Sequence, residues 1–217
     1  MNAPETREQM DRPVVGIVGG ICSGKTTVAR MLAERGYERI DADRIGHEVL
    51  ERADIKRRLK DEFGQNVFRA DGSIDHAELA RRAFREHAST ERLNSIVHPP
   101  ILERIERQIR RADGPVALDA ALLMEKGLHR HYCDVLIFVD APREERLRRA
   151  RQERSWDPEE LERRENAQLP LERKKMESDY VVHNDGSKRE LKHQINQLTG
   201  KIQKTLDPHF SAENQSR

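Results

Sequence analysis

One glycine-rich turn, set between a short apolar run and a helical pattern, constrains the fold more than any other feature of the sequence. Residues 14–18 are apolar and rich in β-branched side chains, which predicts a buried strand. Residues 25–35 carry apolar side chains at helical spacing, and Gly36 is a suitable residue just past a helix end. The turn fills the pattern G-x-x-x-x-G-K-[ST] with Gly19, Gly24, Lys25 and Thr26. Strand, turn and helix in this order predict a phosphate-binding loop; the alternative is a turn of this shape with no ligand.

The residue types of this loop suit a nucleoside triphosphate, whose phosphates bring closely spaced negative charges. Glycines at 20 and 24 let backbone N–H groups approach the phosphates without an intervening Cβ. The following helix points its positive end at them. We expect Lys25 to reach the β- and γ-phosphates and the Thr26 hydroxyl to bind Mg²⁺. The predicted ATP-binding residues are Gly20, Ile21, Cys22, Ser23, Gly24, Lys25, Thr26 and Thr27.

Composition excludes several other functions. Lys+Arg 40 against Asp+Glu 39 leaves a net charge of +1, and only 4% of residues are aromatic, so we expect no nucleic-acid partner. No apolar run has the length of a membrane span, and residues 1–12 lack the apolar core of a signal peptide. The two cysteines form no C-x-x-C pair, so neither a zinc site nor a disulfide framework is indicated. We expect a cytoplasmic protein without a membrane partner, as a monomer or small homo-oligomer.

A second predicted strand, residues 37–40, delivers two carboxylates at its end. In open parallel sheets, ligands bind outside the carboxyl ends of the strands, which places Asp41 and Asp43 beside the phosphate loop. Asp43 is our candidate catalytic base, because a kinase needs a carboxylate near the acceptor hydroxyl. The alternative is that Asp43 caps a helix that starts near Arg44. We expect Asp41 to cap or pack; the alternative is that it holds a Mg²⁺-bound water.

Residues 44–112 show consecutive helical patterns without alternating strands, which predicts a helical insertion. Asp75 and Glu78 form a capping-box pattern that enters a helix over 76–86. The run His98-Pro99-Pro100 predicts a break, with a long helix after it, because a proline disfavours helix at the residue before it. His98 is a candidate substrate contact, with a packed or capping histidine as the alternative.

The chain returns to the predicted sheet at residues 116–123, 135–139 and 180–182. Residues 116–123 form an almost continuous apolar run, as expected of a strand covered on both faces. Asp119 interrupts it, either as a residue behind a metal site or as a paired structural carboxylate. The whole pattern predicts an α/β fold of the P-loop NTPase type: a parallel sheet flanked by helices, with the helical insertion for substrate and a short helical lid.

The predicted lid, about residues 142–176, begins with a helix dense in arginine. Its arginines either line a solvated face, neutralised by nearby glutamates, or close on the transferred phosphoryl group. Asp157 and Pro158 then predict the cap and first position of another helix. We expect one kinase domain over 13–206, a disordered leader at 1–12 and a disordered tail at 207–217.

Seven motifs in this order resemble the dephospho-CoA kinase family over about residues 14–200. They are the phosphate loop at 19–27, Asp41-Ala42-Asp43, the helical region from Asp71 to Phe84, His98-Pro99, Leu122-Leu123-Met124-Glu125, the segment 168–174 and the segment 178–184. The phosphate loop alone is common to many families, whereas the ordered set is specific.

This resemblance implies transfer of the ATP γ-phosphoryl group to the ribose 3′-hydroxyl of dephospho-CoA, with Mg²⁺ as cofactor. It implies Asp43 as base, the insertion as the acceptor-binding part and His98 as a substrate contact. Arg149 falls on the family's lid arginine, and Asn184 falls near its adenine pocket.

Three positions depart from the family pattern. Cys22 replaces a glycine, so the loop keeps its shape only if residue 22 has a negative φ or tolerates strain. Ala121 replaces a proline, and Glu153 stands at a second lid arginine, with Arg154 one residue later. Because Lys25 and a helix N-terminus lower thiol pKa values, we expect Cys22 to be reactive and shielded by nucleotide, against an inert thiol.

Three other functions are considered from the residues alone, one of them a nucleotide-binding scaffold without turnover, which the presence of Lys25, Thr26 and Asp43 together argues against. Another small-molecule kinase, such as a nucleoside monophosphate kinase, shares the same loop. A GTP-dependent switch is suggested by Asp43-Arg44-Ile45-Gly46, which fits D-x-x-G, but no Asn-Lys-x-Asp sequence for guanine is present.

Overall fold

The computed structural model describes residues 12–83 and 85–206. The tail predicted at 207–217 and all but the last residue of the leader predicted at 1–12 lie outside these ranges. The chain divides into two compact units, the first comprising 12–40 and 109–206 of the described residues and the second 41–83 and 85–108. No helix of the described residues combines the length and apolar character needed to cross a bilayer.

Unit 1 is built on a five-stranded sheet in the order β2-β3-β1-β4-β5. The strands are β1 (Val14–Gly19), β2 (Glu38–Asp41), β3 (Val116–Asp119), β4 (Val135–Asp140) and β5 (Tyr180–His183). Strand β1 pairs in parallel with β3 and β4, and β4 pairs in parallel with β5. This arrangement confirms the predicted parallel α/β sheet, with β1 and its loop at the centre.

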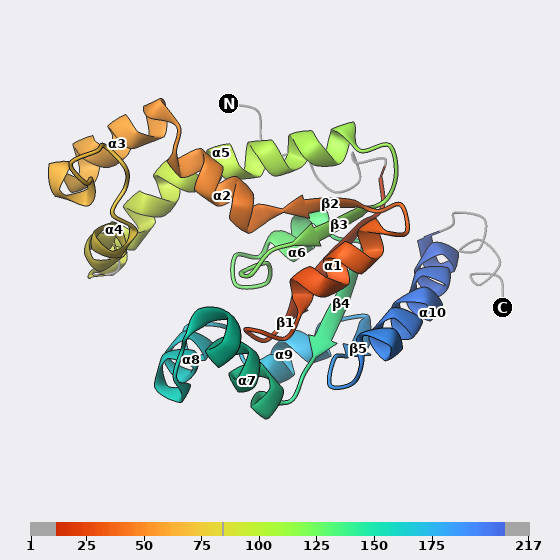
Figure 1. The fold of residues 1–217 in the computed structure, drawn as a ribbon. Coiled ribbons are helices and arrows are strands. Elements are labelled where there is room, and N and C mark those ends of the chain that lie inside the picture. Colours follow the sequence, from red (N-terminus) through yellow and green to blue (C-terminus); the bar gives the residue numbers. More distant parts are fainter. Residues whose placement is uncertain (1–11, 84, 207–217) are drawn as a thin grey trace. The chain divides into compact units, whose positions relative to one another are not determined.

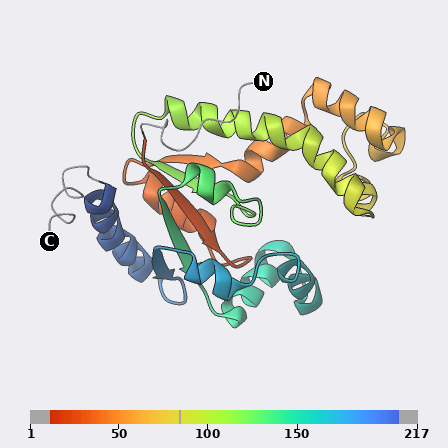
Figure 2. The same cartoon turned by 180° about the vertical axis from the view of Figure 1, so that it is seen from behind.

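Helices cover both faces of this sheet. The helices α1 (Lys25–Ala33) and α10 (Lys188–Leu206) pack on each other and on one face, in front in Figure 1. The helices α6 (Leu128–Tyr132) and α9 (Leu171–Met176) lie against β1 from the other face, seen in Figure 2. The core between sheet and helices is aliphatic, with Ile17, Val28, Leu32 and Ile195 wholly buried. Two further helices complete unit 1: α7 (Arg143–Arg154) and α8 (Pro158–Glu165).

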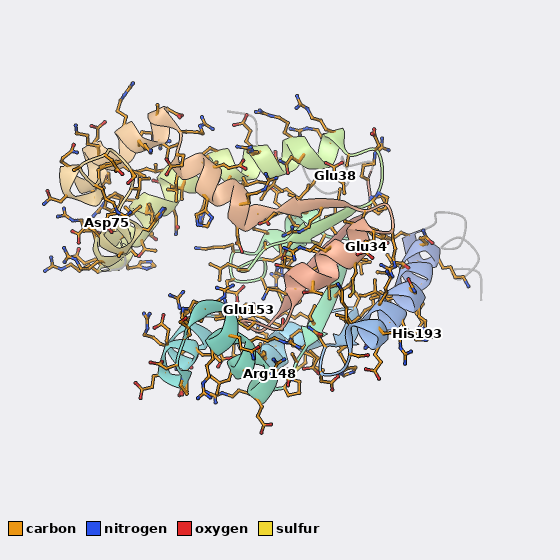
Figure 3. The ribbon with its side chains drawn as sticks, in the orientation of Figure 1. Glu34, Glu38, Asp75, Arg148, Glu153 and His193 are labelled. Carbon is orange, nitrogen blue, oxygen red and sulfur yellow. The ribbon has the colours of Figure 1, made fainter. Side chains whose placement is uncertain are left out.

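Unit 2 is helical, in agreement with the helical pattern of the sequence. It contains α2 (Ala42–Leu50), α3 (Ala53–Phe63), the short η2 (Gln65–Val67), α4 (His76–Ala83) and most of α5 (His87–Arg111). Asp75, labelled in Figure 3, caps α4 by accepting a 3.0 Å hydrogen bond from the N–H of Glu78. Helix α4 is shorter than the range 76–86 that the sequence predicted.

The predicted break at His98-Pro99-Pro100 is wrong, because α5 runs unbroken through both prolines. Prolines at 99 and 100 lack the N–H groups that would reach the carbonyls of Ser95 and Ile96. Arg58 of α3 donates to both carbonyl oxygens instead, at 3.4 Å and 3.5 Å. A side chain distant in sequence therefore supplies the donors that the prolines remove.

The third strand also differs from its prediction. The apolar run 116–123 suggested a strand along its length, but β3 ends at Asp119 and turns follow. The N–H of Leu128 donates to the carbonyl of Leu123 at 3.0 Å, and Leu123 and Met124 are buried. These apolar side chains cover the sheet from a compact turn, and burial alone does not distinguish that arrangement from a strand.

Candidate active site

The phosphate loop has the local structure that its motif predicts. Strand β1 ends at Gly19, α1 begins at Lys25, and Gly24 caps the helix with a left-handed φ of 99°. Within the loop, the N–H of Ser23 donates to the carbonyl of Gly20 at 3.2 Å. The loop thus presents backbone N–H groups at the N-terminus of α1, an arrangement that binds anions.

The two loop glycines also make room for neighbouring protein groups. A Cβ on Gly24 would lie 2.2 Å from Nδ2 of Asn184, and one on Gly20 would lie 3.1 Å from Cδ of Arg146. From the sequence, both glycines are expected to make room for phosphate. The structure adds a second cause, because the side chains of Asn184, just after β5, and Arg146 of α7 lie close to the loop backbone.

Lys25 folds back onto the loop from the first turn of α1. Its Nζ donates to the carbonyl oxygen of Gly20 at 2.8 Å and to that of Gly19 at 3.2 Å. The ammonium group is therefore already at the loop. Exchange of these carbonyl oxygens for phosphate oxygens would need only side-chain rotation, since Lys is a flexible point charge.

Arg149 of α7 and Asn184 after β5 hold the same loop from the other side. Arg149 donates to the carbonyl oxygens of Ser23 at 3.1 Å, Cys22 at 3.3 Å and Asn184 at 2.7 Å. Asn184 donates from Nδ2 to the carbonyl oxygen of Ser23 at 2.7 Å. The structure therefore brings together Lys25, Arg149 and Asn184, three of the residues that the sequence predicted.

Strand register explains this convergence. Gly19 at the end of β1 is opposite Val139 in β4, and Asp140 is opposite His183 in β5. The N–H of Asn184 then donates to the carbonyl of Asp140 at 2.7 Å. Because parallel strands end at one edge, segments about 160 residues apart in sequence meet at the loop.

Thr26 is the residue that the sequence predicts as a Mg²⁺ ligand. Thr26 is exposed, and its hydroxyl makes no hydrogen bond to the residues that the structure describes. Across 12–83 and 85–206 there is no cluster of three His, Cys, Asp or Glu side chains able to hold a metal. Ile21 and Thr27 lie partly exposed at the same loop.

Cys22 adopts the strained alternative. Its φ is +57°, so the loop keeps the left-handed conformation that a glycine would take freely. Burial raises the pKa of its thiol above the ordinary 9.0, although Arg154, Lys25 and Arg146 act in the opposite direction. The predicted lowering of this pKa is wrong, because desolvation of the thiolate outweighs the nearby cations. This direction favours the inert thiol near neutral pH.

Helix α7 sorts its arginines into two groups. Arg148, labelled in Figure 3, is 53% exposed and pairs with Glu145 at 2.8 Å. Arg146 is 5% exposed, donates from Nε to the carbonyl of Ala141 at 3.1 Å and pairs with Glu165 of α8. The solvated face that the sequence suggested is confirmed for Arg148, whereas closure of an arginine on the phosphoryl group stays a prediction. The sequence did not single out Arg146, and no signal in one arginine-rich helix separates it from its neighbours.

The carboxylates after β2 divide their roles. Asp41 caps α2, accepting a hydrogen bond from the N–H of Arg44 at 2.9 Å, and α2 begins at Ala42. The alternative that Asp43 is the cap is therefore wrong. Asp43 lies in the first turn of α2, and His98 lies half-buried within α5. Both belong to unit 2, and their roles toward substrate stay predictions.

Asp119 is a paired structural carboxylate in the described structure. It is 7% exposed and accepts a hydrogen bond from Nη2 of Arg39 at 2.8 Å. This pair satisfies the charge that interrupts the apolar run. A role behind a metal ion is not needed to explain its position.

The sequence pattern did not indicate a buried ion pair between α9 and the turn after β3. Lys174 of α9, with a side chain 2% exposed, lies 2.5 Å from Glu125 and donates to Oε1 of Gln168 at 2.9 Å. Glu125 also accepts from the N–H of Leu169 at 3.2 Å. The network joins the turn after β3 to the segment between α8 and α9. Both partners lie in motifs quoted above, but a charge pattern alone does not pair residues so far apart.

Comparison with known proteins identifies the chain's relatives. A family model described as dephospho-CoA kinase matches residues 13–190. A dephospho-CoA kinase of Corynebacterium glutamicum is 35% identical over 193 residues, covering 87% of this chain and 96% of that protein. One from Carboxydothermus hydrogenoformans is 36% identical over 188 residues, covering 84% of this chain and 91% of that protein.

Solved structures agree in fold. TT1252 from Thermus thermophilus has a TM-score of 0.79 at 32% identity and covers 88% of this chain and 98% of that one. Dephospho-CoA kinase from Campylobacter jejuni has a TM-score of 0.57 at 20% identity, covering 88% and 97%. Shikimate kinase from Acinetobacter baumannii has a TM-score of 0.50 at 16% identity, covering 91% and 97%. The last two show the fold alone, and together they confirm the predicted fold class.

Proposed function

The chain belongs to the dephospho-CoA kinase family, and on that premise we propose that it transfers the γ-phosphoryl group of ATP to the ribose 3′-hydroxyl of dephospho-CoA, forming coenzyme A. One observation supports this most directly. Lys25 and Arg149 both donate to carbonyl oxygens of a loop whose N–H groups lie at a helix N-terminus. Two cations beside an anion-binding backbone suit the charge of a transferring phosphoryl group.

We assign the nucleotide to this loop. The N–H groups of residues 20–27 bind the phosphates, Lys25 reaches the β- and γ-phosphates, and Arg149 closes on them from α7. Asn184, whose backbone carbonyl holds Arg149, borders the nucleotide at the end of β5. The region 142–176 acts as a lid, which excludes water during transfer.

Thr26 is the residue that would hold Mg²⁺. Its exposed hydroxyl at the start of α1 fits a cation that binds mainly to phosphate oxygens. When bound, the ion would neutralise charge on the phosphates. Lys25 and the loop N–H groups orient those phosphates from the protein side.

We place the acceptor with unit 2. Asp43 in the first turn of α2 is the proposed base, which orients the 3′-hydroxyl and takes its proton. Asp41 occupies the cap position, so Asp43 is spared that role. His98 is proposed as an acceptor contact. The expected partners stay a small-molecule substrate without nucleic acid or membrane, in a cytoplasmic monomer or small homo-oligomer.

The deciding experiment measures ATP consumption with Mg²⁺, with and without dephospho-CoA. We expect turnover that requires dephospho-CoA and falls about a thousandfold in Asp43→Asn, since loss of a general base costs on the order of 10²–10⁴ in rate. Asp41→Asn is the control variant. An Asn side chain still caps a helix, so this variant should keep wild-type turnover.

Each other outcome has a definite meaning. Turnover that survives in Asp43→Asn would remove Asp43 as the base. Activity on AMP or CMP, but none on dephospho-CoA, would favour a nucleoside monophosphate kinase. Slow GTP hydrolysis without any acceptor would favour the switch.

A further inference from the structure

Arg146 is a buried cation beside the phosphate loop to which the proposed function gives no role. We propose that Arg146 is a third cation of the ATP-phosphate site, beside Lys25 and Arg149, and that Glu165 holds it in place until the nucleotide binds. This inference rests on the proposed ATP-dependent function, because it concerns the ligand of the same loop.

Arg146 lies on the same side of α7 as Arg149 and close to the loop. Arg146 precedes Arg149 by three residues, so both side chains lie on one face of α7. Arg149 reaches the carbonyls of Cys22 and Ser23, while a Cβ built on Gly20 would lie 3.1–3.2 Å from Cδ, Nε and Nη1 of Arg146. Arg149 therefore donates to residues 22 and 23 of the loop, while Arg146 lies close beside Gly20.

Two hydrogen bonds hold the guanidinium group of Arg146 in place. Nε donates to the carbonyl oxygen of Ala141 at 3.1 Å, and Nη1 donates to Glu165. A guanidinium has five N–H donors in one plane. Nη2 of Arg146 makes no hydrogen bond to any residue in the described part of the chain. The group is thus oriented in advance and keeps donors for a further acceptor, as a phosphate-binding arginine requires.

The charge of Arg146 is poorly solvated. Arg146 is 5% exposed, whereas Glu165 is 21% exposed and Arg143 of the same helix is 50% exposed. Burial lowers the pKa of Arg146, and repulsion from Arg143 adds to this effect. A cation that the protein has desolvated gains strongly from a second anion nearby. The phosphates of ATP, on the loop that Arg146 touches, are the anion that this position suits.

The competing explanation is structural: the pair with Glu165 only fastens α7 to α8. The two explanations differ once both charges are removed together. Replacing a buried ion pair with apolar side chains often restores stability that either single change loses. A structural brace would then recover every property, whereas a phosphate ligand would not.

The experiment compares Arg146→Met, Glu165→Leu and the double variant with the wild type. Thermal unfolding gives Tm, and calorimetric titration gives the dissociation constants of ATP and AMP. We expect the double variant to regain the wild-type Tm but to bind ATP about tenfold to a hundredfold more weakly, the range of a charged hydrogen-bonding group. The dissociation constant of AMP, which lacks the β- and γ-phosphates, should change less than about threefold in the double variant.

Arg143→Met is the control on the same helix, because Arg143 also lies 3.9 Å from Glu165 but is half exposed. It should leave ATP affinity within about twofold of wild type. If the apolar pair does not fold, Arg146→Gln with Glu165→Gln replaces it as a neutral, hydrogen-bonding pair, and the same expectations apply.

If the double variant has the wild-type Tm and also binds ATP with wild-type affinity, this inference is overturned and the proposed function stands. A wild-type protein that binds no ATP would instead contradict the proposed function itself, and this inference with it.

Discussion

At the phosphate loop and at the prolines of α5, arginine side chains donate to backbone carbonyl oxygens from a distant element. In unit 2, Arg58 reaches the carbonyls of Ser95 and Ile96 that two prolines leave without helical donors. In unit 1, Arg149 reaches the carbonyls of Cys22 and Ser23 beside N–H groups that can bind an anion. The same kind of contact thus serves a helix in one place and fixes a cation beside the loop, where we propose the phosphates bind, in the other. Only the surroundings distinguish the two roles, and substitution should separate activity from stability.

The largest effect should come from the loop lysine. Lys25→Met should lower kcat about a thousandfold, because its charge acts on the phosphates in the transition state. Loss of its hydrogen bonds to the carbonyls of Gly19 and Gly20 should also lower Tm moderately. Steady-state kinetics of ATP consumption measures this. Lys175→Met is the control, since Lys175 is 48% exposed and pairs with Asp140. A loss of less than about tenfold would remove Lys25 from the proposed chemistry.

The second largest effect is expected from Arg149→Met, which should lower kcat/KM for ATP about tenfold to a hundredfold. Its loss also removes the donor to the carbonyl oxygen of Cys22 and one of two donors to that of Ser23, which Asn184 still serves, so a moderate fall in Tm is expected. Arg148→Met, on the exposed face of α7, should change neither quantity. Equal effects of the two substitutions would contradict the division of α7 into two faces.

Arg58→Met should act on stability alone. Loss of two long hydrogen bonds to the α5 carbonyls should cost about 1 kcal/mol, or about 2–4 °C in Tm. KM for ATP should stay unchanged. Arg57→Met is the neighbouring control, because Arg57 is exposed and makes no hydrogen bond to the described residues. A Tm unaffected by Arg58→Met would mean that water serves these carbonyls equally well.

The smallest effect concerns the loop cysteine and pH. Because the pKa of Cys22 lies above its ordinary 9.0, the neutral thiol predominates at pH 7 and the thiolate fraction rises only through the raised pKa. Alkylation by iodoacetamide, followed by mass spectrometry of the Cys22 peptide, should be slow at neutral pH and still rising above pH 9. The Cys22→Ser variant corrects for Cys133. A rate that reaches its plateau below pH 8 would restore the lowered pKa first expected.

Predictions from sequence succeeded where one short segment contains its own explanation. Asp157 and Pro158 predict the start of α8, and the N–H of Glu160 indeed donates to Asp157 at 2.7 Å. They failed where a distant partner decides. The prolines at 99 and 100 favour a break until Arg58 is known to serve the freed carbonyls. Apolar character alone did not show that β3 ends at Asp119.

The candidate site divides in the same manner. The motif identified Lys25 and Thr26 because glycines, lysine and hydroxyl stand at fixed local spacing. Choosing among the arginines of α7 required their burial, since Arg146 and Arg148 are equivalent in the sequence pattern but are 5% and 53% exposed. The thiol of Cys22 needed the same information, because desolvation depends on everything packed around it.

The sequence by itself determined the central strand, the phosphate loop and the helix that follows, since these depend on backbone freedom and side-chain types within about twenty residues. The family followed from seven short motifs in order. Only the tertiary structure decided that Arg146, Arg149 and Asn184 meet at the loop, and that Lys174 is buried against Glu125. The physical reason is that charge pairing and desolvation depend on distances in space, which strand register and helix packing set across the whole chain.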